Sequence, residues 1–206
     1  NILDTPGHQD FSEDTYRTLM AADSAVMVID ASKGVEAQTI KLFKVCVMRH
    51  IPIFTFVNKM DRIGANFLRC VDMIKTRLGA RPMVMALPIG AESDFKGIVD
   101  ILNKNAIIWH SEDLGASFEE QEIPAELKAD AEKYYNEMVE MAVEMDDAAM
   151  EAYLEGNEPD MATLMKCIRK GTIEQKFVPV LCGSAFKNKG VQLLLDAVVD
   201  YLPSPI

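Results

Sequence analysis

Three polar motifs in this chain each follow directly after an apolar run. Asp-Thr-Pro-Gly-His occupies residues 4–8 behind Ile2 and Leu3, Asn-Lys-Met-Asp occupies residues 58–61, and Gly-Ser-Ala occupies residues 183–185. Short apolar runs of this kind are typical of buried strands in parallel sheets. Because open α/β sheets bind ligands beyond the carboxyl ends of their strands, we expect the three motifs to converge on one site.

The first motif suits a hydrated magnesium ion beside a phosphate. Asp4 can hold the metal through a water molecule. Gly7 has no side chain to keep its N–H away from a terminal phosphoryl oxygen, and ordering of the loop after it would report whether that phosphate is present. An aspartate can also cap a helix, but the adjoining Thr-Pro-Gly-His favours the metal role.

The second and third motifs suit a guanine base. Asp61 can accept two parallel hydrogen bonds from N1–H and the exocyclic amine, a donor pair that adenine lacks. Asn58 is a second polar reader, and the stem of Lys59 can lie along the base plane. Ser184 and Ala185 can present backbone N–H groups to the guanine O6. Four-residue strings recur by chance, so the combination of both motifs carries the prediction.

The order and content of these motifs resemble those of a GTPase, and the histidine after Asp-Thr-Pro-Gly resembles the translational GTPases. The resemblance covers essentially the whole chain. Within residues 1–60, the stretch 10–19 and much of the stretch 20–56 are closer to peptide chain release factor three. The segments that resemble bacterial-type elongation factor G are residues 58–67, 88–92, 182–191 and 200–205.

The resemblance implies an α/β fold, the P-loop-type GTPase three-layer sandwich, with bound GTP or GDP and Mg²⁺. It implies that His8 positions the attacking water and that Asp4 contacts Mg²⁺ through water. His50 and His110 are interpreted as ordinary residues. The candidate GTP-binding residues are Asp4, Thr5, Pro6, Gly7, His8, Asn58, Lys59, Met60, Asp61, Gly183, Ser184 and Ala185.

Two elements of such a site have no counterpart in the sequence. There is no Gly-x-x-x-x-Gly-Lys-[Ser/Thr] loop, the motif that cradles the α- and β-phosphates, and no upstream switch threonine. Both precede the Asp-Thr-Pro-Gly strand in this family, and Asn1 opens inside a strand-like segment. We therefore expect a piece of a longer protein that continues beyond residues 202–205. Alone, it should bind GTP poorly and hydrolyse it negligibly.

Hydrophobic patterning predicts strands over residues 24–30, 52–57 and 178–182. A helix between the first two would make a right-handed crossover. Helices are also predicted over residues 66–78, with Gly79 as C-cap, and over residues 190–201, before Pro203.

Roughly 100 residues lie between Gly79 and the strand near residue 178, so the two guanine motifs are separated by far more than one strand–helix unit. The GTPase domain is therefore predicted at residues 1–79 and 175–206, with an inserted α+β subdomain at 80–174. The insertion has strand candidates at 83–89 and 97–109, and a long helix from Pro124 to about Tyr153.

Charge is concentrated in the insertion. The net charge is −11, yet residues 111–160 hold 17 acidic residues against Lys128 and Lys133, a local charge of −15, which leaves +4 elsewhere. Such a surface disfavours phosphate backbones and favours a basic protein patch. In elongation factor G this subdomain faces the ribosomal stalk protein, so the resemblance implies stalk docking here. A solvated helix face is the alternative.

Three functions therefore remain open. The first is a ribosome-stimulated GTPase that acts at the large-subunit factor-binding site and drives translocation of tRNA and mRNA. The second is a release factor three-like GTPase of termination, and the third is a non-catalytic docking module for the stalk. The four cysteines lack C-x-x-C spacing and are interpreted as reduced core thiols. No apolar run approaches the ~20 residues of a membrane span, so a monomeric cytoplasmic protein without membrane contact is expected.

Overall fold

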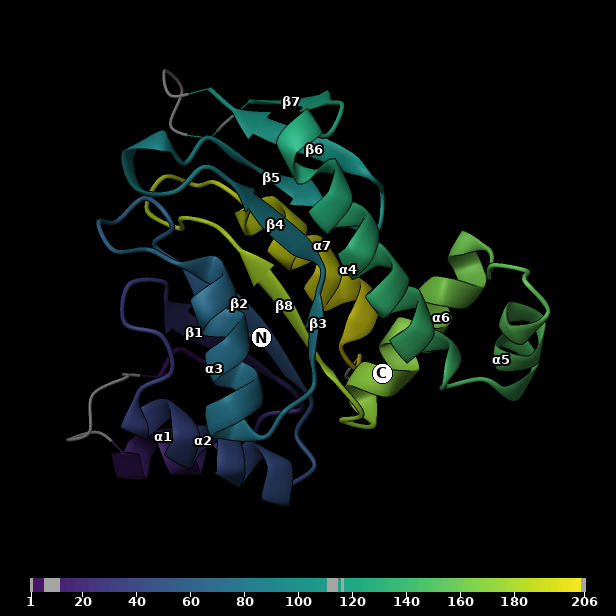
Figure 1. Ribbon diagram of the computed structural model, residues 1–206. Coiled ribbons are helices and arrows are strands. Elements are labelled where there is room, and N and C mark those ends of the chain that lie inside the picture. The colour runs from purple at the N-terminus through teal and green to yellow at the C-terminus, as the bar shows by residue number, and fades with distance from the viewer. Residues whose placement is uncertain (1, 6–11, 111–114, 116, 205–206) are drawn as a thin grey trace.

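The computed structural model describes residues 2–5, 12–110, 115 and 117–204. Within these residues the strands form a parallel sheet and an antiparallel sheet, each of four strands (Figure 1). The parallel sheet has the order β1-β2-β8-β3, and every neighbouring pair in it is parallel. Its strands are β1 (Ala25–Asp30), β2 (Ile53–Asn58), β8 (Val178–Cys182) and β3 (Pro82–Val84).

Helices cover both faces of the parallel sheet, which gives the predicted three layers. Figure 1 shows α2 (Ala37–Met48) and α3 (Phe67–Leu78) on one side, with α6 (Met161–Ile173) and α7 (Val191–Tyr201) on the other. The register of β1, β2 and β8 brings their carboxyl ends to one edge, because Asp30 pairs with Asn58 and Val57 pairs with Cys182. The helices of this part are α1 (Ser12–Leu19), α2 (Ala37–Met48), α3 (Phe67–Leu78) and α7 (Val191–Tyr201).

Local signals fix the helix after β2 as predicted. The Asn66 side chain caps α3 by accepting a hydrogen bond from Arg69 N at 2.9 Å, and Gly79 ends the helix in the left-handed conformation. A side-chain cap satisfies an orphan backbone donor, and glycine adopts positive φ without a Cβ penalty. The carboxyl end of β2 is therefore connected to α3 by a short, well-defined loop.

The antiparallel sheet has the order β4-β5-β6-β7. The strands of this sheet are β4 (Ala86–Ile89), β5 (Gly97–Asp100), β6 (Asn105–Trp109) and β7 (Phe118–Gln121). A short 3₁₀ turn, η2 (Glu92–Asp94), lies in the β4–β5 connection. The helices that come after the sheet in the sequence are α4 (Ala125–Val143), α5 (Asp147–Leu154) and α6 (Met161–Ile173).

Three predicted elements of the insertion are divided in the structure. The apolar run 83–89 contributes β3 to the parallel sheet and β4 to the antiparallel one, because the chain changes sheet at Met85. The run 97–109 is a hairpin whose turn is closed by Asn103 N donating to Asp100 Oδ1 at 3.2 Å. The long helix is interrupted after α4, where Asp146 caps α5 by accepting from Ala149 N.

Two predictions near the amino terminus are wrong. Ile2 and Leu3 are not in a strand, and Ile2 is 91% exposed. Two residues form too few ladder hydrogen bonds to hold a strand on their own. The continuous apolar run 24–30 also predicts a strand covered on both faces, but Val28 of β1 is 57% exposed. In the part of the chain that the structure describes, β1 is an edge strand with one open face.

One continuous core joins the two sheets. Phe54 and Phe56 of the parallel sheet belong to the same buried cluster as Ile98, Met138 and Leu164. Met85 links the sheets through its backbone, since its N–H donates to Val180 O and its carbonyl accepts from Ile101 N. Close-packed interiors transmit displacement, so the antiparallel subdomain is not loosely tethered.

All four cysteines are free and buried. Burial raises the pKa of the Cys46 and Cys70 thiols to about 11, which disfavours the reactive thiolate.

None of the helices within the described ranges combines the length and apolar character that a membrane crossing needs.

Candidate functional site

The loop after β2 is bonded directly to the loop after β8. Asn58 Oδ1 accepts from Ala185 N at 2.9 Å and from Lys59 N at 2.7 Å. Met60 N donates to Gly183 O at 3.1 Å, and Met60 is only 1% exposed. Lys59 adopts a φ of 64°, an uncommon value for a non-glycine residue. The second and third motifs therefore form one structural unit at the edge of the parallel sheet.

The loop after β8 is closed on itself. Ser184 is fully buried and forms an isolated bridge with Lys189, in which each N–H donates to the other residue's carbonyl. A Cβ on Gly183 would lie 2.2 Å from Lys189 O and 2.8 Å from the ring of Phe56. Only glycine fits this place, so the small residues of the motif are required by the packing of the loop.

Asp61 has free acceptor capacity at this unit. Asp61 is partly buried, and the neighbouring cations Lys59 and Arg62 pair with Asp30, so among the described residues no side chain donates a hydrogen bond to the Asp61 carboxylate. The neighbouring backbone is fixed, since Arg62 N donates to Lys59 O at 3.0 Å and Ala65 N donates to Arg62 O at 3.0 Å. A partly buried carboxylate on a fixed loop can accept paired donors from a ligand.

Asp30 is a component of this edge that the motif reasoning missed. It ends β1, and its Oδ2 lies 2.9 Å from Lys59 Nζ and 3.4 Å from Arg62 Nη1. Its Oδ1 accepts from Ser32 Oγ at 2.6 Å. Partial burial raises the pKa of Asp30, but the hydrogen bonds from Ser32 and Lys59 outweigh it and hold the pKa well below its usual value.

The Asp30 carboxylate is therefore an anion that orients the Lys59 side chain. One signal could have revealed it, because Asp30 stands at the carboxyl end of a predicted strand, as Asn58 does. The shared edge of a parallel sheet makes such terminal polar residues candidates for the same site.

The first motif is not assembled with the other two in the described residues. Asp4 is exposed and lies outside any strand, and Thr5 is partly buried. Pro6, Gly7 and His8 lie outside the described residues. The remaining histidines lie at the surface, where His110 Nε2 is 3.3 Å from a Glu119 carboxylate oxygen and His50 comes just after α2.

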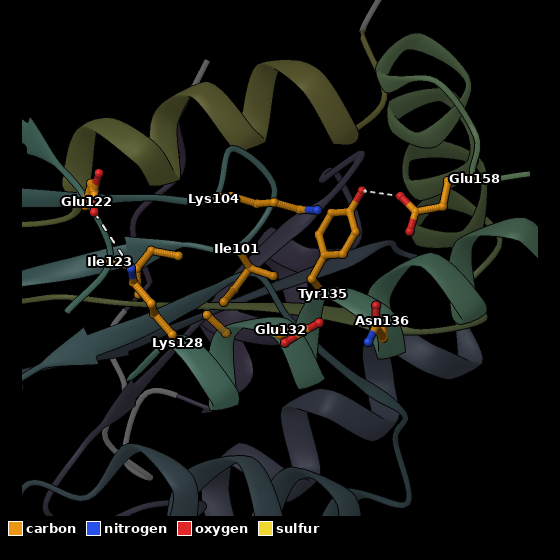
Figure 2. A pocket seen from close by; sticks show the side chains of 10 residues that line it. Ile101, Lys104, Glu122, Ile123, Lys128, Glu132, Tyr135, Asn136 and Glu158 are labelled. Atoms are coloured by element: carbon orange, nitrogen blue, oxygen red, sulfur yellow. Dashed lines mark hydrogen bonds and ion pairs between the residues drawn. The ribbon is translucent and has the colours of Figure 1, made fainter. Parts of the chain in front are cut away.

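A pocket of about 500 Å³ lies in the antiparallel subdomain, against α4 (Figure 2). Figure 2 shows the Tyr135 ring between Lys104 and Glu158. The Lys104 ammonium lies 3.5 Å from the ring centroid, and the Tyr135 hydroxyl donates to Glu158 at 3.5 Å. None of its lining residues belongs to the three motifs. The pocket is therefore formed without the predicted site residues.

Comparisons with known proteins show which family the chain resembles and which fold it has. The model of the elongation factor Tu GTP binding domain family matches residues 1–204. Elongation factor G of Wolbachia pipientis subsp. Culex pipiens (strain wPip) is 56% identical over 206 residues, which are all of this chain and 30% of that protein. The crystal structure of a protein from Thermus thermophilus superposes with a TM-score of 0.89 at 28% identity, and the match covers 98% of this chain and 30% of that one. The predicted fold class is thereby confirmed.

Proposed function

The chain belongs to the elongation factor Tu GTP-binding domain family, as an elongation factor G-like translational GTPase domain, and from this premise we propose that its sheet edge reads guanine. Asp61 accepts from N1–H and the exocyclic amine, and Asn58 and the Lys59 stem hold the base. Such paired recognition rejects an analogue that lacks the donors by roughly 10⁴-fold. The prediction that the Ser184 and Ala185 N–H groups meet O6 is wrong for this structure, because they donate instead to Lys189 O and to Asn58 Oδ1, each at 2.9 Å.

The observation that carries this proposal is the hydrogen bond between Asn58 Oδ1 and Ala185 N at 2.9 Å. It joins two motifs that are 127 residues apart in the sequence. A structural role for either motif alone would not require this contact. The free carboxylate of Asp61 beside it supplies the acceptor pair that distinguishes guanine from adenine.

We propose that residues 4–8 supply the phosphate side of the site. The exposed Asp4 carboxylate offers the oxygen ligands that Mg²⁺ prefers, so the residue type fits a water-mediated metal contact. A bound Mg²⁺ would neutralise charge on the β- and γ-phosphates. In this proposal Gly7 N–H contacts the γ-phosphate and His8 orients the attacking water in the intact protein.

The chain spans about 30% of the length of the relatives it matches, so the activity of the whole protein is also a proposal. We infer a cytoplasmic GTPase that is stimulated by the ribosome at the large-subunit factor-binding site and drives translocation of tRNA and mRNA. The match to elongation factor G covers all 206 residues, including residues 1–60, which favours this role over release factor three-like termination.

The isolated 206-residue chain is expected to bind GTP only weakly. Isothermal titration with GTP and Mg²⁺ should give a Kd above about 100 μM, because the guanine contacts act without a phosphate-cradling loop. The full-length gene product, titrated in parallel, should bind much more tightly. Micromolar or tighter binding by the isolated chain would contradict the importance assigned to that loop.

We propose that the inserted segment predicted at residues 80–174, of whose described strands only β3 joins the parallel sheet, docks on the ribosomal stalk protein through the exposed acidic face of α4. The negative charge around α4 supports a basic partner. Glu144 is not part of the free face, since its two carboxylate oxygens accept from Arg81 at 2.6 and 2.8 Å. The proposed contact is therefore limited to Glu137 and Glu140, both exposed; Glu137 has only a long ion pair, 3.9 Å from Lys133 Nζ, on the same helix.

Reversing these two charges, Glu137→Lys with Glu140→Lys, should lower stalk-dependent GTPase stimulation by about tenfold, because charges that face a partner steer association. Nucleotide affinity should change less than about twofold, since neither residue contacts the motifs. The measurement compares stimulated hydrolysis of full-length proteins at two salt concentrations. The control is the pair Asp72→Lys and Asp196→Lys, which are exposed acids on α3 and α7. Equal effects of both pairs would indicate that the α4 glutamates form only a solvated helix face.

A further inference from the structure

The turn between β4 and β5 contacts the guanine-reading loop through Glu92. The Glu92 N–H donates to Met60 O at 2.8 Å. Its Oε1 accepts from Gly64 N at 2.7 Å. These two bonds attach to the chain on either side of Asp61, so a single residue of the antiparallel subdomain holds both ends of the segment that carries the candidate guanine acceptor.

The backbone of this turn is confined to an unusual conformation. Glu92 has a φ of 56°, in the left-handed region that non-glycine residues rarely adopt. Gly90 has a φ of 78°, and a Cβ there would lie 2.1 Å from Asp94 O. Residues in such conformations persist only where their surroundings determine them, and they cluster at functional sites. The turn therefore presents Glu92 to the loop in one orientation.

The same turn also contacts the second guanine loop. Lys189 Nζ donates to Phe95 O at 3.4 Å, and Lys189 is only 9% exposed. Burial lowers the pKa of Lys189, Lys187 adds to this effect, and Asp61 opposes it. Residues 92–95 thus contact residues 60–64 on one side and Lys189 on the other, where the two loops meet.

We propose that Glu92 is a positioning residue for guanine recognition, which holds the segment 60–64 so that the Asp61 carboxylate meets both donors of the base. This inference rests on the proposed function. It adds that the antiparallel subdomain contributes to base specificity as well as offering a docking face. Displacement of the β4–β5 turn would be transmitted to Asp61 through the Met60 and Gly64 bonds.

The test measures GDP and IDP affinities of the full-length gene product, since the hypoxanthine of IDP lacks the exocyclic amine. Glu92→Ala removes the acceptor for Gly64 N and should lower GDP affinity about tenfold, because small misplacements of a recognition group are costly. The ratio of GDP to IDP affinity should fall about fivefold, because the Asp61 carboxylate is no longer aligned with both N1–H and the exocyclic amine of guanine. Glu92→Gln keeps an Oε1 acceptor and should retain most of the ratio.

The matched control is Asp94→Ala. Asp94 is an exposed carboxylate in the same turn, and within the described residues no hydrogen bond joins its side chain to either guanine loop. Glu92→Asp keeps the charge but shortens the side chain, and it should give an intermediate ratio even if Glu92→Ala does not fold. Thermal melting of each variant separates a loss of stability from a loss of base discrimination.

The outcomes are distinct. An unchanged GDP to IDP ratio in folded Glu92→Ala or Glu92→Asp would overturn the inference, as would an equal fall in Asp94→Ala. Both results leave the proposed function intact, provided that the unmodified protein prefers GDP. If the unmodified protein shows no preference for GDP over IDP, the proposed guanine site fails, and the role of Glu92 fails with it.

Discussion

Asp61→Asn in the full-length gene product is expected to lower GDP affinity by about 10³- to 10⁴-fold. An amide offers one acceptor and one NH₂ group, so it cannot accept from both N1–H and the exocyclic amine of guanine. Xanthine has a carbonyl in place of that amine. The same variant should therefore bind xanthosine diphosphate more tightly than the unmodified protein does, which reverses the base preference.

Competition between GDP and xanthosine diphosphate for a fluorescent nucleotide measures this change. Asp72→Asn on α3 is the control, because Asp72 is exposed and lies outside the motif in the sequence. A variant that loses affinity for both nucleotides and melts at a lower temperature would indicate damage to the loop. A variant that keeps its GDP affinity would show that Asp61 does not read the base.

The sequence predicted best those elements whose signals are local. The continuous apolar runs that became β1, β2 and β8 are typical of parallel strands, and the polar residues just after β2 and β8 lie at their shared edge. The Asn66 cap and the Gly79 terminus of α3 are also local. Convergence of the loops after β2 and β8 results from parallel topology alone, so it could be predicted without any contact information.

The failures share a different cause. The run 83–89 is apolar throughout, yet it serves two sheets, and apolar character alone does not show where a buried chain changes partner. The missed site residues depend on tertiary contacts as well. Asp30 acts through Lys59, and Glu92 acts through Met60 and Gly64. Contacts between residues so far apart in the sequence have no short-range signature.

The guanine loop is attached to three different parts of the protein. The guanine loop is held from the parallel sheet by Asn58, from β1 by the Asp30–Lys59 pair, and from the antiparallel subdomain by Glu92. A partner that docks on α4 therefore acts on a body that shares a core with the base-reading loops. If docking on α4 changes nucleotide affinity by some factor, bound nucleotide changes docking affinity by the same factor.

His8→Ala is expected to reduce ribosome-stimulated GTP hydrolysis by about 10²- to 10⁴-fold in the full-length protein. GTP affinity should stay within about twofold, because a group that orients water contributes to the transition state and little to ground-state binding. Single-turnover phosphate release with saturating ribosomes measures the rate, and nucleotide titration measures the affinity. Equal losses in rate and affinity would place His8 in nucleotide binding instead.

His8→Gln separates the two chemical roles that an imidazole could have. A glutamine carbonyl accepts a hydrogen bond from water but cannot take up a proton near neutral pH. If His8 only orients the attacking water, the glutamine variant should retain a rate well above that of His8→Ala, with the same pH dependence as the unmodified protein. If His8 is a general base, the two variants should be equally slow, and both should lose the rise in rate that accompanies deprotonation of the imidazole. We expect the first result, since phosphoryl transfer depends mainly on positioning and on electrostatic stabilisation.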